Sequence, residues 1–121
     1  MSKHEIPHQQ WAPFLESFSL EHAGKLVSVK SRHPQQGIVL EIENKPFEGL
    51  VQETESEQER IAIIFDQGSR TSRTHFVCSP RQIRLRTTPD GTEEGVEIDA
   101  DDGRTVVVQF CGISSVGIEA A

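Results

Sequence analysis

The sequence of 121 residues contains no tyrosine, one tryptophan and two cysteines, and aromatic residues make up only 6% of it. Its longest clearly apolar run, residues 61–65, is far too short to cross a bilayer as a helix. The opening residues M-S-K-H-E-I-P lack the apolar core of a secretory signal. These absences predict a cytoplasmic protein that does not associate with membranes.

Positive charge is also scarce, with 12 Lys and Arg against 19 Asp and Glu, so the net charge is −7. Such a charge repels phosphate backbones, and we therefore expect no nucleic-acid partner. The two cysteines, Cys78 and Cys111, lie far apart in segments that we expect to be strands. In a chain without a secretory signal this predicts two buried, reduced thiols rather than a disulfide.

The sequence contains no nucleophile elbow, phosphate-binding loop or paired acid–base set. His75 and Cys78 have an H-x-x-C spacing, but in a regular strand they point to opposite faces, and a zinc site normally has two ligand pairs. The acidic stretch 97–103 does not place glycine and glutamate as a calcium loop requires, so we expect a hairpin turn there. We therefore predict no catalytic residue, no metal and no cofactor.

Residues 7–23 have the pattern of an amphipathic helix that follows a frayed N-terminus. Four bulky apolar side chains recur there at helical spacing, namely Trp11, Phe14, Leu15 and Phe18. Pro7 and Pro13 suit the first positions of two successive helical segments, a single turn and then the main helix, and Gly24 is placed to end it. Because so short a helix is marginal alone, we expect it to pack on a sheet.

From residue 25 to residue 111 the apolar pattern changes to the period of two that is typical of antiparallel strands. We expect Ile38, Leu40 and Ile42 to form the buried face of one strand, which Lys45-Pro46 ends. Residues 53–59 are then an acidic, solvated connection to the most hydrophobic strand, residues 60–66. Ser79-Pro80 suits a sharp corner between two later strands. Residues 112–121 are expected to form a tail.

The charges and apolar residues of the last third predict strand registers. Three pairs are expected between residues 82–88 and 95–100, namely Leu85 opposite Ile98, Arg86 opposite Glu97 and Arg84 opposite Asp99. At the next turn two registers are open. A two-residue turn would pair Val107 with Ile98, whereas a three-residue loop with a left-handed Gly103 would pair Val106 with Ile98 and Val108 with Val96. We prefer the three-residue loop because it keeps apolar residues opposite apolar residues.

Five arginines lie in a stretch with no acid between Asp66 and Asp90, namely Arg70, Arg73, Arg81, Arg84 and Arg86. One interpretation is an anion-binding patch, since the guanidinium fork matches carboxylate and phosphate groups. The interpretation that we favour is that Arg84 and Arg86 pair with Glu97 and Asp99 on the neighbouring strand, while the other arginines are solvated.

The opening pattern I-P-x-x-x-W-x-x-F-L-x-x-F-S-x-x-H-x-G, followed by L-V, resembles a family of short bacterial proteins known as a domain of unknown function. The resemblance extends to T-H-F-V-C-S-P-R-Q-I-R-L at residues 74–85 and to D-G-R-T-V-V-V-Q-F at residues 102–110. It implies a bacterial, cytoplasmic, self-standing domain and transfers no activity, ligand or catalytic residue.

Together these patterns predict one domain over residues 1–121, mainly β, with the helix packed on a curved antiparallel sheet or small barrel of six to eight strands. Our leading hypothesis is a non-catalytic binding or regulatory module that acts on a protein partner or on itself, for example as a homodimer. The alternative is an anion-binding domain with a pocket between helix and sheet, for which the candidate residues are Trp11, Phe65, His75, Arg84 and Arg86. A ligand-binding domain should have a deep, partly polar cavity under the helix, and an interaction module a filled core.

Overall fold

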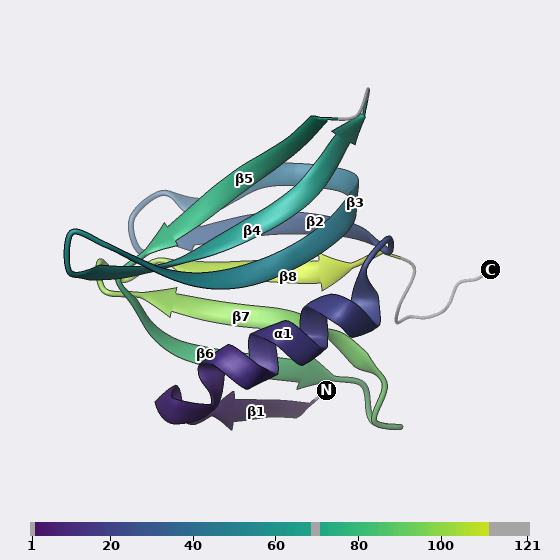
Figure 1. Cartoon of the computed structure of the whole chain (residues 1–121), viewed down its shortest axis with the longest axis horizontal. Helices are drawn as coiled ribbons and strands as arrows, with labels where there is room; N and C mark the ends of the chain where they lie inside the picture. Colours follow the sequence, from purple (N-terminus) through teal and green to yellow (C-terminus); the bar gives the residue numbers. More distant parts are fainter. Residues whose placement is uncertain (1, 69–70, 112–121) are drawn as a thin grey trace.

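The computed structural model describes residues 2–68 and 71–111, which fold into an eight-stranded antiparallel sheet and a short α-helix (Figure 1). The strands are β1 (Ser2–Ile6), β2 (Leu26–His33), β3 (Gly37–Glu55), β4 (Gln58–Gly68), β5 (Thr71–Cys78), β6 (Pro80–Thr87), β7 (Glu93–Ala100) and β8 (Thr105–Phe110). A single 3-10 turn, η1 (His8–Gln10), leads into helix α1 (Trp11–His22). The predicted mainly β fold is therefore confirmed, and the sheet stays open rather than closing into a barrel.

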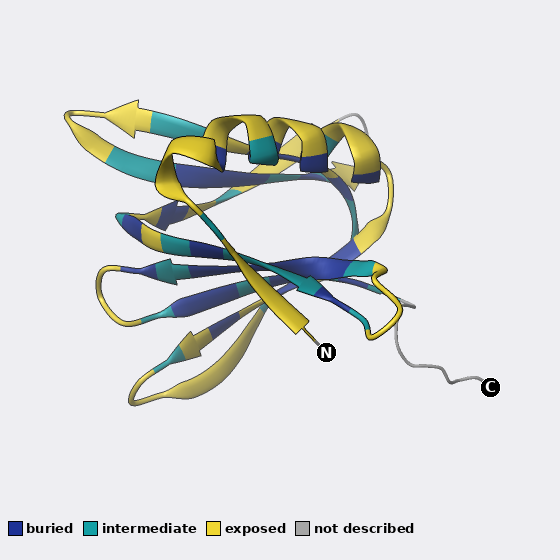
Figure 2. Ribbon diagram, turned by 90° about the horizontal axis from the view of Figure 1, so that it is seen from below, coloured by how far each residue is buried: buried dark blue, intermediate teal, exposed yellow. Residues whose placement is uncertain are grey.

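Strand β3 bends the sheet into two layers. The strand order is β1-β6-β7-β8-β2-β3-β4-β5, and β3 is 19 residues long. Its first half pairs with β2, while its second half, from Phe47 onward, pairs with β4. The chain therefore passes from one layer to the other within a single strand, and α1 covers one side of the space between the layers (Figures 1 and 2).

Helix α1 closes the core with one buried stripe, formed by Trp11, Leu15, Phe18 and His22. The ring of Phe18 lies 5.9 Å from Phe47 of β3 and 5.6 Å from Phe110 of β8, measured between ring centroids. Gly24, with φ of 91°, follows the helix in the left-handed conformation that glycine adopts without strain. The predicted aromatic helix over the sheet is confirmed, with its 3-10 turn and its α-helical part in the predicted order, but the α-helix begins at Trp11 and not at Pro13 as predicted.

Strand β1 differs from the frayed N-terminus that the sequence predicts. Its residues are almost all exposed and show no alternating apolar pattern. The strand is held instead by backbone pairing along β6, with Ser2 opposite Thr87 and Ile6 opposite Ile83. Because backbone hydrogen bonds do not depend on side-chain type, nothing in the residues signals this edge strand.

Two predictions about β3 are wrong. Lys45-Pro46 does not end the strand, because Pro46 lies at the bend where β3 leaves β2 and needs no hydrogen-bond donor there. Ile38 and Leu40 do not form a buried face with Ile42: both are exposed, and Ile42 alone of the three is buried. The register shifts between β2 and β3 separate the exposed residues from the buried one.

Residues 53–59 are mostly strand rather than the solvated connection that was predicted. Strand β3 extends to Glu55 and β4 begins at Gln58, so that only Ser56 and Glu57 form the turn. Both turn residues have positive φ, 52° and 68°, as the tight two-residue hairpin turn requires. The acidic residues lie on the ends of a long hairpin, where strand pairing outweighs their low strand propensity.

The predicted register of β6 on β7 is wrong by two residues. Ile83, not Leu85, lies opposite Ile98, and Arg84 lies opposite Glu97. The pairing is irregular near the loop: Arg86 lies opposite Gly95 but Thr87 lies opposite Glu93, so β7 has one more residue there than β6. A shift of two leaves every side chain on its predicted face, so the arginines still meet the predicted acids.

The preferred register of β8 on β7 is confirmed. Val106 lies opposite Ile98 and Val108 opposite Val96. Gly103 has φ of 95°, as the three-residue loop requires. The apolar pairs fixed this register because both strands bury the same face.

Both cysteines are free thiols as predicted, but neither is buried: Cys78 is exposed and Cys111 is partly exposed. Cys78 lies on the outer face of β5, whereas its neighbour Val77 points inward and is buried. The predicted corner follows at Ser79, whose φ is 51°. The predicted tail, residues 112–121, lies outside the described residues.

Candidate interaction surface

Helix α1 and the loop after it take the place of a neighbouring strand along the second half of β3. Gly24 N donates to Phe47 O (2.7 Å) and Phe47 N donates to Lys25 O (2.8 Å). Farther along the strand, Leu50 N donates to the side-chain oxygen of Ser19 (2.8 Å). These bonds satisfy a sheet edge with a helix, and they draw α1 close to the backbone of β3.

Gly49 permits this close approach. A Cβ atom at position 49 would lie 3.3 Å from the Ser19 Oγ atom, which is tighter than ordinary contact. The Ser19 hydroxyl in turn donates within the helix to Leu15 O, at 2.6 Å. Small residues on both elements therefore bring helix and strand together and leave a groove above the contact.

The groove has a volume of about 520 Å³ and lies between α1 and the outer side of β3 and β4. The residues that shape it include Ala12, Glu16, Leu20, Glu48, Val51 and Ile64. Leu20 is 78% exposed and Val51 is 42% exposed. Two large apolar side chains thus stand uncovered on either side of a mostly apolar depression.

The face of the sheet that carries Val51 also carries an exposed apolar residue of β5, Phe76, with the buried Ala62 of β4 between them. Val51, Ala62 and Phe76 are paired across the three strands and so lie on one face. Phe76 is 40% exposed, and the Arg60 guanidinium lies over its ring at 4.0 Å from the centroid. We call the groove and this row of three residues the groove surface.

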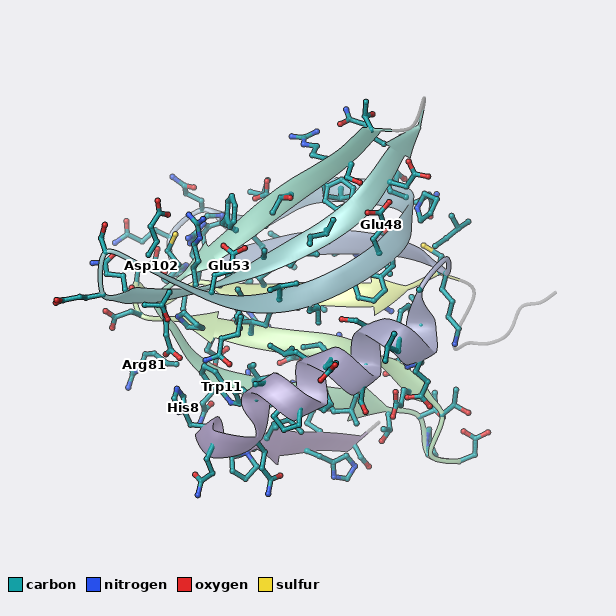
Figure 3. All side chains as sticks on the ribbon, viewed as in Figure 1. His8, Trp11, Glu48, Glu53, Arg81 and Asp102 are labelled. Carbon is teal, nitrogen blue, oxygen red and sulfur yellow. The ribbon has the colours of Figure 1, made fainter. Side chains whose placement is uncertain are left out.

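Two carboxylates border the groove, one from each side. Glu16 comes from α1 and Glu48 from β3, and Figure 3 labels Glu48. Glu48 also accepts a hydrogen bond from the Ser72 hydroxyl (2.8 Å). The rim of the groove is therefore negatively charged, like the chain as a whole, whose net charge is −7.

Of the five residues predicted to bind a small ligand, Trp11 and Phe65 are buried in the core. The indole Nε1 of Trp11 donates to Ile6 O at 2.9 Å, which fixes the start of the helix to the end of β1. Both aromatic side chains fill space between the layers and leave no surface for a ligand to contact.

His75 lies half-buried on the inner face of β5. Its Nε2 atom is buried and has no hydrogen-bond partner within residues 2–68 and 71–111. Burial lowers the pKa of His75, and Arg104 and Arg73 act in the same direction, while Glu41 opposes them. Around His75 the structure thus gathers mixed charges rather than one charged patch.

Arg84 and Arg86 lie on the outer face, in an ion-pair network over β1, β6 and β7. Arg84 contacts Asp99 at 2.7 Å and Glu97 at 3.0 Å, and Glu97 also contacts Arg86 at 3.5 Å and Lys3 at 3.1 Å. The pairing of these arginines with Glu97 and Asp99 is the interpretation favoured from the sequence. The ion pair from Lys3 was not expected, because β1 was not predicted. Since Ile83 and Leu85 alternate with these arginines, the arginines point away from Trp11 and Phe65, and the five candidates do not form one site.

The network changes the acidity of its members. Hydrogen bonding to Asp99 raises the pKa of Arg84, and hydrogen bonding from Arg84 lowers the pKa of Asp99. Burial alone would raise the pKa of Glu97, but hydrogen bonds from Arg84 and Lys3 outweigh it, and the pKa is lowered. All of these carboxylates already have cationic partners, which supports a structural role.

A second cluster, at the end of α1, was not predicted from the sequence. The His22 ring contacts the rings of both Phe18 and Phe110, which also stack on each other; its Nε2 lies 2.6 Å from Glu93, and its Nδ1 lies 2.9 Å from the Lys25 ammonium. The ammonium can only donate, so Nδ1 accepts and Nε2 donates to Glu93.

Glu21, His22 and Glu93 are close enough together to be considered as metal ligands. A metal on Nε2 would move the ring proton to Nδ1, where it would face the Lys25 ammonium. These side chains are therefore better suited to a hydrogen-bonded link between α1 and β7, from His22 to Glu93, than to a metal site. His22 carries a sequence signal in retrospect, because it continues the helical stripe of Trp11, Leu15 and Phe18.

Sequence reasoning also missed the groove surface. Leu20 offers the one clear signal, because it lies off the buried stripe of α1 and so has to be either covered by something else or exposed. The close approach of α1 to β3 depends on Ser19 and Gly49, which are 30 positions apart and carry no pattern. Within the described residues, no helix is long and apolar enough to span a membrane.

The fold and surface define a small domain in which an open, two-layered antiparallel sheet is closed by one helix, with an apolar groove beside that helix. The chain belongs to the family described as "Family of unknown function (DUF5335)", whose match covers residues 2–116. This confirms the resemblance found in the sequence. No curated protein and no solved structure matches the chain.

Proposed function

We propose that this domain is a non-catalytic binding module that captures a segment of a partner protein on the groove surface. The observation that carries the proposal is the exposure of Leu20 and Val51 on the two sides of one apolar groove. Exposed apolar grooves with a polar rim are characteristic of protein interaction sites. The proposal includes the sequence-based expectation that the domain works in a bacterial cytoplasm.

The filled core supports an interaction module over the small-ligand alternative. The largest aromatic side chains, among them Trp11, Phe18, Phe47 and Phe65, are buried in contact with one another and with the sheet. The groove lies outside this core and opens to solvent, and mainly apolar side chains line it. Such a surface fits an extended or helical peptide better than a compact anion.

The rim determines the chemistry of the partner. Glu16 and Glu48 border the groove, and the chain carries a net charge of −7. A partner segment should therefore present apolar side chains to Leu20 and Val51 and carry Lys or Arg on its flanks. Burying an exposed leucine side chain contributes roughly 1.5–3 kcal/mol, so these two contacts would supply a large part of a micromolar affinity.

A displayed library of random peptides, selected against the immobilised full chain, tests the proposal. We expect enrichment of peptides with two or more apolar residues and flanking basic residues. Their affinity should fall by about tenfold or more in the Leu20→Asp variant, since about 1.4 kcal/mol corresponds to tenfold. The matched control is Leu26→Asp, which places the same charge at another exposed apolar position, away from the groove, and should leave binding unchanged.

Three results would contradict the proposal: no enrichment, enrichment of peptides that bind Leu20→Asp as well as the natural chain, or enrichment of acidic peptides. Amide chemical shifts provide an independent check of location. The selected peptide should shift the amides of Leu20, Val51 and Ile64, and shifts centred on His75 would instead favour the alternative ligand site.

A further inference from the structure

The first half of β3 has an open edge. Residues 38–42 pair with β2 on one side, and β4 pairs with β3 only from Phe47 onward. On the remaining side, residues 37–44 have no strand partner in the described part of the chain. The hairpin of β2 and β3 is the part of the sheet farthest from the helix, at the bottom of Figure 2, and the start of β3 is exposed there.

Three consecutive apolar side chains lie on this open edge. Ile38 is 69% exposed, Val39 is 39% exposed and Leu40 is 49% exposed. Because neighbouring residues of a strand point to opposite faces, both faces of the edge are apolar. The other two edges of the sheet are mainly polar, with S-K-H-E in β1 and T-S-R-T-H at the start of β5, where Phe76 is the single exposed large apolar residue. Charged and polar edge residues hinder pairing with another chain, and this part of β3 lacks them.

The sequence of the edge is complementary to itself in one antiparallel register. If a two-fold axis passes through Val39, then Ile38 of one copy lies opposite Leu40 of the other, and Val39 lies opposite itself. Gly37 then lies opposite Glu41, so that no two like charges are paired. A register centred on Glu41 would place two glutamates opposite each other, and one centred on Leu40 would place Val39 opposite Glu41.

We propose that two copies of this chain associate through residues 37–41 of β3, in an antiparallel pair centred on Val39. The pairing joins the two sheets across a two-fold axis, which is the usual symmetry of a homodimer. It satisfies the open backbone groups of both copies and covers Ile38, Val39 and Leu40. A contact of five residues a side is small, so we expect a weak dimer that dissociates on dilution.

This inference does not depend on the groove surface, which lies on the second half of β3. Sedimentation of the full chain over a range of concentrations tests it. The natural chain should pass from monomer to dimer with concentration, and Val39→Lys should remain monomeric, because the lysines would face each other on the axis. Val39 is partly exposed, so the fold should tolerate the change, which circular dichroism can check.

A charge-exchange experiment makes the register itself falsifiable. Val39→Lys and Val39→Glu should each be monomeric alone and should form a heterodimer when mixed, because only the mixed pair places opposite charges across the axis. Leu20→Asp should dimerise like the natural chain, which separates this test from that of the groove surface. A natural chain that remains monomeric at high concentration, an undiminished dimer in Val39→Lys, or no recovery on mixing would overturn the proposal.

Discussion

Replacing Ser19 with alanine should remove the hydrogen bond that joins helix α1 to Leu50 of β3. The Ser19 oxygen accepts a hydrogen bond from Leu50 N at 2.8 Å, and Leu50 is buried. Leaving that amide without a partner costs roughly 1–3 kcal/mol. Alanine is the better helix former by up to about 0.7 kcal/mol, which opposes the loss. The free energy of unfolding should therefore fall by about 0.3–2.3 kcal/mol.

Urea unfolding of the natural chain and the variant measures this difference directly. Ser72→Ala is the matched control, because the Ser72 hydroxyl also donates a hydrogen bond, to Glu48, but on the exposed face of β5. The control should change the free energy of unfolding by less than about 0.5 kcal/mol. Equal effects of the two substitutions would refute the view that Ser19 replaces a strand partner for β3.

Two further predictions concern the sheet. Arg84→Gln should lower the free energy of unfolding at neutral pH, because Arg84 depresses the pKa of Asp99 in the folded state. The stabilisation by this ion pair is complete above the ordinary Asp pKa of about 4, and it is lost as the pH falls through the depressed pKa of Asp99 in the folded protein. Urea unfolding at several pH values should show the two proteins converging in acid, and a constant difference would contradict the ion-pair account. Gly95→Ala should prevent stable folding, since its Cβ would lie 2.0 Å from the backbone oxygen of Val108, whereas Gly91→Ala meets no atom and carries only the strain of its left-handed φ of 91°, so it should cost far less. Circular dichroism and soluble yield measure that contrast, and a folded Gly95→Ala would show the close approach of β7 and β8 to be wrong.

The parts of the fold that depend on repeating apolar patterns could be predicted from the sequence. The stripe from Trp11 to Phe18 predicted the helix, and the valines of β8 predicted their own register, because each pattern reports which side chains are removed from water. The ion pairs of Arg84 were predicted for the same kind of reason, since charge alternates with apolar residues along β6.

The remaining features depend on contacts that leave no local pattern. Strand β1 is held by its backbone, the bend of β3 allows Pro46 within a strand, and Ser19 reaches a backbone amide 31 positions away. The exposed face of β3 at Ile38 looks in the sequence like a buried one, because an alternating pattern does not tell whether another layer covers it. The groove surface and the open edge both follow from these long-range contacts, so neither could be predicted.

Amide hydrogen exchange along β3, measured at low and at high protein concentration, tests the central claim that one half of this strand is covered by α1 and the other half is open. The account predicts slow exchange at Phe47 and Leu50 at both concentrations. It predicts fast exchange at alternate amides within residues 37–41 in dilute solution, and slower exchange there as the concentration rises. Fast exchange at Leu50, or uniform protection of the whole strand in dilute solution, would contradict it.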